Sequence, residues 1–109
     1  MRADTIIQNW FLIDFTSDEE GERLDKRVLW GIVVDDRKGR WIPGDWCCTS
    51  LILKEHDDQL FETSNSFYQA QGHGTRMEAP TAAMQLLRSG YSPDQWPALK
   101  SLGDQMKGS

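Results

Sequence analysis

The 109-residue sequence is poor in cysteine, and its only two cysteines, Cys47 and Cys48, are adjacent. Neighbouring residues of a strand point to opposite faces, so a structural disulfide between them is not expected. A zinc site needs about four ligands at characteristic spacings, which this pair does not supply. We therefore predict two free thiols in a reducing compartment, and no metal.

Long apolar runs and excess basic charge are also missing. No stretch approaches the roughly 20 apolar residues of a membrane-spanning helix, and the start of the chain has no secretory signal pattern. These absences predict a cytoplasmic protein without membrane contact. The formal net charge is −5, with 12 Lys and Arg against 17 Asp and Glu. This balance opposes direct nucleic-acid binding, which needs a basic surface for the phosphates.

What the sequence does contain is a series of β-rich segments separated by turns. Strands are predicted at residues 6–15 and 27–35, at about 40–42, and at 46–54 and 59–71, because β-branched and aromatic residues concentrate there. A turn is predicted at residues 36–39, and Pro43-Gly44 fits a type II turn. Connections this short predict antiparallel pairing in sequence order.

The last third of the chain changes to helix formers. Residues 80–89 predict a helix with Gly90 as its C-cap, and a second helix is predicted from Pro97, with apolar residues at helical spacing. The predicted fold is α+β: a curled antiparallel sheet or small open barrel of four to five strands, followed by a C-terminal helical pair. We expect one domain over residues 1–109, with a β region at about 5–72 and a helical region at about 80–106.

Tryptophan is abundant, with five in the chain. Trp41 and Trp46 flank the predicted type II turn, beside Arg40 and Asp45. Aromatic residues and arginine are the side chains that most often anchor protein interfaces. We therefore single out Arg40, Trp41, Asp45 and Trp46 as partner-binding residues. The alternative is that the two tryptophans form a cross-strand pair that covers the end of the sheet.

Motifs for catalysis or cofactor binding do not stand out. A nucleophile, base and acid can be assembled from Cys47 or Cys48, His73 and Asp45. No flanking basic group or helix N-terminus marks either thiol as activated, however. The sequence therefore predicts no enzyme, no cofactor and no metal. A small enzyme or ligand-binding domain that uses Cys47 or Cys48 and His73 is the alternative.

Three separated motifs resemble a group of small uncharacterised proteins from bacterial genomes and prophages, over about residues 28–92. The motif residues are Trp30, Gly31, Val33, Gly44, Asp45, Cys48, Thr49, Ser50, Thr63, Asn65, Ser66 and Tyr68. The resemblance carries no known activity and implies an accessory protein of a mobile element that inhibits or tunes a larger host protein. We therefore predict a small acidic protein that binds a protein partner, with self-association as a related form of binding.

Overall fold

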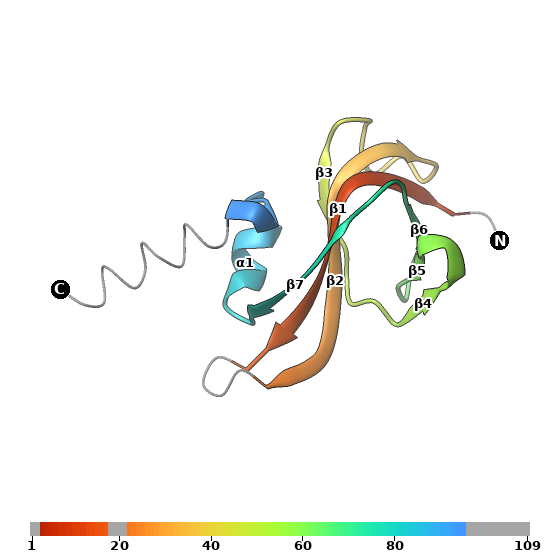
Figure 1. The fold of residues 1–109 in the computed structure, drawn as a ribbon. Coiled ribbons are helices and arrows are strands. Elements are labelled where there is room, and N and C mark those ends of the chain that lie inside the picture. Colours follow the sequence, from red (N-terminus) through yellow and green to blue (C-terminus); the bar gives the residue numbers. More distant parts are fainter. Residues whose placement is uncertain (1–2, 18–21, 96–109) are drawn as a thin grey trace.

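A computed structural model describes residues 3–17 and 22–95, and about half of these residues lie in strands of one mixed sheet. The sheet order is β3-β2-β1-β6-β5-β4, and β7 also pairs with β1. In Figure 1 helix α1 lies on one side of the long strands, and β4, β5 and β6 lie on the other. The elements are β1 (Thr5–Thr16), β2 (Arg23–Asp36), β3 (Trp46–Cys48), β4 (Lys54–His56), β5 (Leu60–Glu62), β6 (Phe67–Ala70), β7 (Thr75–Pro80) and α1 (Ala83–Arg88).

The long strands β1 and β2 pair antiparallel and contribute side chains to both faces of the sheet. Leu12 lies opposite Leu29, and the next pair, Ile13 and Val28, points to the other face. All four side chains are fully buried. Because both faces are covered, both strands are apolar on both sides, and the strands predicted at 6–15 and 27–35 are found here.

The second edge of β1 is shared by two strands that both run parallel to it. β6 pairs with residues 5–7, and β7 pairs with residues 11–16. The predicted antiparallel sheet in sequence order is therefore wrong. Short connections exclude parallel pairing only between consecutive strands, and four strands separate β1 from β6 in the sequence.

Trp10 lies at the break between β6 and β7. Its indole N–H donates to the Gly72 carbonyl at 3.2 Å, and a Cβ on Gly74 would lie 2.2 Å from two atoms of the Trp10 ring. A side chain at Gly74 would therefore collide with the indole. The predicted β region ends at about residue 72, whereas the sheet continues beyond this loop into β7.

Buried residues form two clusters. The first, here called the Trp10 cluster, comprises Ile7, Trp10, Leu12, Leu29, Val33, Cys47, Ile52, Phe61, Tyr68 and Ala70. The second, here called the helix cluster, comprises Ile13, Phe15, Val28, Trp30, Ala79, Ala83 and Leu87. Cys47 belongs to the first cluster, whereas Cys48 packs against the second, and both are free thiols.

Several predicted strands are shorter than expected or are not formed. Residues 40–42 form no strand, and the stretch 46–54 is in strands only at its two ends, as β3 and β4. The stretch 59–71 is split into β5 and β6 by a turn. The Thr63 hydroxyl oxygen accepts hydrogen bonds from the backbone N–H groups of Asn65 at 3.3 Å and Ser66 at 3.1 Å, which reverses the chain there.

The predicted α+β fold with a C-terminal helical pair is also wrong. The described residues contain one α-helix, α1, and two short 3-10 turns, Asp57–Gln59 and Pro93–Gln95. Helix α1 lies within the predicted range 80–89, and Gly90 follows it with φ +107°, as expected beyond a helix end. The second predicted helix, from Pro97 onward, lies outside the described residues. Within residues 3–17 and 22–95, no helix is long and apolar enough to span a membrane.

Candidate functional site

The segment singled out from the sequence lies in the connection between β2 and β3. Its centre is a tight turn in which the Asp45 N–H donates to the Ile42 carbonyl at 3.0 Å. The Asp45 carboxylate accepts the N–H of Ile42 at 3.1 Å and closes the turn a second time. Gly44 has φ +97°, the conformation that the third position of a type II turn requires.

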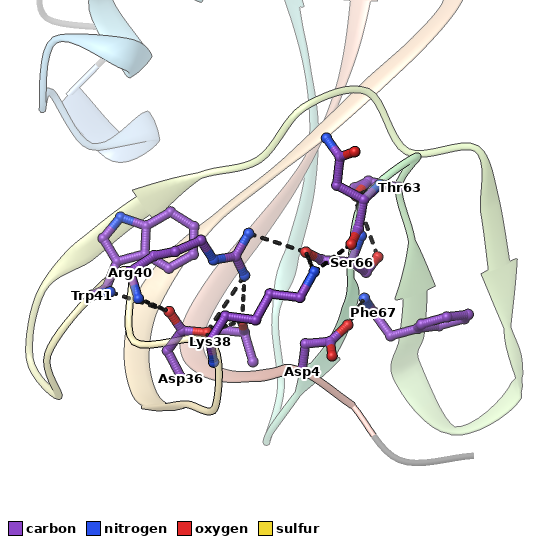
Figure 2. A network of polar contacts seen from close by, with 10 residues as sticks. Asp4, Asp36, Lys38, Arg40, Trp41, Thr63, Ser66 and Phe67 are labelled. Atoms are coloured by element: carbon purple, nitrogen blue, oxygen red, sulfur yellow. Dashed lines mark hydrogen bonds and ion pairs between the residues drawn. The ribbon is translucent and has the colours of Figure 1, made fainter.

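The start of this connection is fixed by the carboxylate of Asp36, at the end of β2. Its oxygens accept hydrogen bonds from the backbone N–H groups of Arg40 at 2.7 Å and Trp41 at 3.1 Å. They also accept the hydroxyl of Thr5, on β1, at 2.9 Å. Figure 2 shows the Asp36 carboxylate with its contacts to Arg40 and Trp41. The carboxylate therefore ties the turn to the first strand of the sheet.

The hydrogen bonds to the Asp36 carboxylate lower its pKa. Its side chain has no exposed surface, and burial alone would raise the pKa. The hydrogen bonds from Thr5, Arg40 and Lys38 act in the opposite direction and lower the pKa to about 2. Asp36 is therefore ionised throughout the neutral range, and its charge is held by donors from the turn and from β1.

Two basic side chains extend the network to the turn between β5 and β6. The Arg40 guanidinium donates to the Ser66 hydroxyl oxygen at 3.0 Å and lies 4.4 Å from the centre of the Trp41 ring. The Lys38 ammonium donates to the same Ser66 oxygen at 3.0 Å and to the Asn65 carbonyl at 2.5 Å (Figure 2). The Arg40 guanidinium is thus held by intramolecular contacts and lies over the Trp41 ring.

A cleft of about 400 Å³ opens beside this turn, and we call it the β3 cleft. It is lined by Trp41, Asp45, Trp46, Cys47, Cys48 and Arg88. Three of the four predicted partner-binding residues therefore meet at one site, and Arg40 stands behind them. Arg88 was missed, because the sequence does not show that the last turn of α1 lies beside β3.

The β3 cleft is lined by side chains from both faces of β3, at the edge of that strand. Side chains of adjacent strand residues point to opposite faces, yet both Cys47 and Cys48 line the cleft. Trp41 lies in a bend and packs against the Trp10 cluster, whereas Trp46 lies on β3, against Gly90. The alternative of a cross-strand tryptophan pair is therefore not formed. The Trp46 side chain remains 38% exposed.

The two thiols do not meet the histidine with which they were grouped. His73 lines a different cleft, with Trp10 and Gly74 among its neighbours, and not the cleft that holds the two cysteines. Burial raises the pKa of Cys47 to about 12. Burial also raises the pKa of Cys48 to about 11, although the nearby Arg88 lowers it. Both sulfurs are therefore protonated at neutral pH.

The remaining surface clefts hold charged groups that pair with one another. Arg27 lies 3.5 Å from Glu55 and 3.9 Å from Asp14, Arg76 lies 2.5 Å from Glu55, and His56 lies 2.9 Å from Glu62. Among the residues that the structure describes, no group of three or more His, Cys, Asp or Glu side chains is arranged to hold a metal ion. The β3 cleft instead brings together the exposed Trp46, the half-buried Trp41 and the cation of Arg88.

Comparison with known proteins gives one match. A family model described as Domain of unknown function (DUF6957) matches residues 2–86. No curated protein and no solved structure matches the chain. The matched span contains every residue that lines the β3 cleft except Arg88. The predicted likeness to an uncharacterised family is confirmed, whereas the bacterial and mobile-element context stays a prediction.

Proposed function

The chain belongs to this family of unknown function, and we propose that it is an accessory protein without catalytic activity that binds a protein partner through the β3 cleft. One observation carries the proposal: the exposed indole of Trp46 and the guanidinium of Arg88 share a cleft with Trp41. Tryptophan and arginine dominate the binding energy of protein interfaces.

The rigidity of the cleft wall supports binding. Trp41 is held by its backbone hydrogen bond to Asp36 and by the cation of Arg40 over its ring. Asp45 is held by its own contacts across the tight turn. A surface that is already ordered loses less conformational entropy when a partner binds. The network around Asp36 therefore favours binding without touching the partner itself.

The chemistry of the thiols favours binding over catalysis. A nucleophilic cysteine needs a lowered pKa or a nearby base, whereas burial raises the pKa of both Cys47 and Cys48. In this proposal the partner is a larger host protein whose activity the chain modulates. The resemblance to small prophage proteins supports that part, and the net charge of −5 suits a soluble accessory subunit.

The proposal is tested by capture of the tagged protein's partner from host lysate with paired variants. Trp46→Ala removes the exposed indole of the cleft, and Leu53→Ala removes a side chain that is 64% exposed and lies outside the cleft. We expect one stoichiometric partner to be retained by the wild type and by Leu53→Ala, and to be lost with Trp46→Ala. Equal retention by all three proteins would contradict binding through the β3 cleft.

A further inference from the structure

The outer edge of β3 is open in the described part of the chain. β3 is the last strand in the sheet order, so β2 pairs with only one of its sides. In the register with β2, the Val33 N–H donates to the Asp45 carbonyl and the Thr49 N–H donates to the Leu29 carbonyl. Antiparallel strands alternate their hydrogen-bonded residues. The backbone N–H and C=O groups of Trp46 and Cys48 therefore point away from β2.

The β3 cleft lies along this open edge. Its walls come from both faces of the sheet, because Cys47 packs in the Trp10 cluster and Cys48 packs against the helix cluster. Trp41 therefore stands on the Cys47 side of the edge, and Arg88 stands on the Cys48 side. An occupant of the cleft meets main-chain donors and acceptors in the middle and side chains above and below.

Arg88 has no acidic partner among the described residues, which sets it apart from most arginines of the chain. Arg23, Arg27, Arg40 and Arg76 each lie within ion-pair distance of a carboxylate. Arg88 instead lies beside the thiol of Cys48. A guanidinium forms its strongest hydrogen bonds with a carboxylate. The charge of the cleft therefore suits an occupant that brings its own acidic group.

We propose that the partner adds an extended peptide segment as a further strand on the outer edge of β3, and that this segment places a carboxylate side chain on Arg88. The proposal rests on the proposed function and specifies its binding mode. Strand addition supplies main-chain hydrogen bonds for affinity and side-chain pockets for specificity. Alternation along the added strand sends one side chain toward Trp41 and its neighbours toward Trp46 and Arg88.

The main-chain part is tested by Cys48→Pro against Cys48→Ala. The Cys48 N–H points away from β2, so proline removes it and places a ring on the open edge while the ladder to β2 survives. Alanine removes the thiol alone. The probe is a phage-displayed library of random dodecapeptides selected on the immobilised wild-type protein. We expect the selected peptides to bind Cys48→Ala normally and to bind Cys48→Pro at least about tenfold more weakly.

The charge part uses the same peptides with Arg88→Gln against Arg37→Gln. Arg37 is exposed and lies outside the cleft, so its replacement should leave binding unchanged. We expect selected peptides to share an Asp or Glu, and Arg88→Gln to weaken their binding about tenfold. Replacing that acid by its amide in the peptide should cause no further loss in the Arg88→Gln variant.

Each other result overturns the inference in a distinguishable way. If no peptide is enriched and no lysate protein is captured, both the strand addition and the proposed function fail. If peptides bind and are lost with Trp46→Ala but not with Cys48→Pro, the cleft binds its partner without strand addition. If sedimentation equilibrium shows that the wild type dimerises and Cys48→Pro does not, the edge serves a second copy of the chain instead. Circular dichroism and thermal unfolding of Cys48→Pro check whether the fold is retained, which the comparison requires.

Discussion

The two tryptophans buried on opposite faces of the sheet differ in how their polar atoms are satisfied. Trp10, in the Trp10 cluster, donates its indole N–H to the Gly72 carbonyl and packs against Gly74. Trp30, in the helix cluster, is equally buried, yet its indole nitrogen has no acceptor among the described residues. One indole therefore combines packing with a hydrogen bond, while the other has packing contacts alone.

The same difference extends to the surroundings of each cluster. Beside the Trp10 cluster, the network of Asp36 and Arg40 joins β1, β2 and the turn before β6. The helix cluster borders a void of about 10 Å³ next to Ile13 and Leu87, which is lined by the six-residue helix α1 and by residues 91–93 that follow it. The side-chain hydrogen bonds of Asp36 and Arg40 thus lie beside the Trp10 cluster. The β3 cleft lies at the strand edge where the two faces of the sheet meet. The predictions below test this division.

The largest expected effect is at the contact between Gly74 and Trp10. Gly74→Ala places a Cβ 2.2 Å from the indole ring, so the loop or the ring must move. We expect a loss of about 3 kcal/mol in the free energy of unfolding. Gly72→Ala, in the same loop, meets no atom within 4 Å and adds only the strain of φ +73°. We expect a cost of about 1 kcal/mol there.

Urea unfolding of both variants, followed by tryptophan fluorescence, measures these costs. A Gly74→Ala variant as stable as Gly72→Ala would show that the break between β6 and β7 is not closed by Trp10, and would remove the main support for the contrast between the faces.

The next effect concerns Asp36. Asp36→Asn removes the charge that accepts hydrogen bonds from Thr5, Arg40 and Trp41, and we expect a loss of about 2 kcal/mol at neutral pH. The pKa of Asp36 is about 2 in the folded protein against 3.8 ordinarily. The folded state therefore binds this proton less readily, so the stabilisation is present above about pH 4 and is lost as the pH falls toward about 2.

Chemical unfolding of the wild type and Asp36→Asn between pH 2 and pH 7 tests this sign. Other carboxylates titrate in both proteins, so the difference between the two curves isolates Asp36. We expect the difference to be constant near neutrality and to shrink below about pH 4. A difference that grows toward acid pH would contradict the role of the charge.

The features of the fold that the sequence predicts correctly are those that depend on residues close together in the chain. The long strands β1 and β2 are found where β-branched and aromatic residues predict them, since local composition reflects burial on both faces. The parallel pairing of β1 with β6 and β7 depends on contacts across about 60 residues, which no local pattern shows. The turn that splits residues 59–71 depends on the hydroxyl of Thr63, a polar residue that local β-propensity counts as a strand former.

The candidate site divides in the same way. The sequence predicts that Trp41, Asp45 and Trp46 lie together, because they fall within six residues of one another around a recognisable turn, and they do line one cleft. Arg40 was predicted to contact a partner, whereas its guanidinium bonds to Thr5 on β1 and to Ser66 in the turn before β6, both distant in the sequence. Arg88 was missed because its place beside Cys48 follows from the packing of α1 on the sheet. Sequence spacing thus predicts that Trp41 and Trp46 lie together, whereas the position of Arg88 beside them is seen only in the structure.

The smallest expected effect sharpens the comparison between the two tryptophans. Trp10→Phe removes a hydrogen bond donor and leaves the Gly72 carbonyl with one partner fewer, in addition to losing buried area. We expect it to cost about 1.5 kcal/mol. Trp30→Phe loses a similar area, but it also removes a buried N–H that has no described acceptor.

Removing an unsatisfied buried donor offsets part of the lost apolar contact. We therefore expect Trp30→Phe to change the free energy of unfolding by less than about 1 kcal/mol, in either direction. Equilibrium unfolding in urea of the two variants side by side measures the difference. Because both substitutions shorten the same ring system, their gap reports the hydrogen bond rather than the area. A Trp30→Phe cost equal to or above that of Trp10→Phe would show that the Trp30 indole N–H is satisfied in solution, and the two faces of the sheet would then no longer differ.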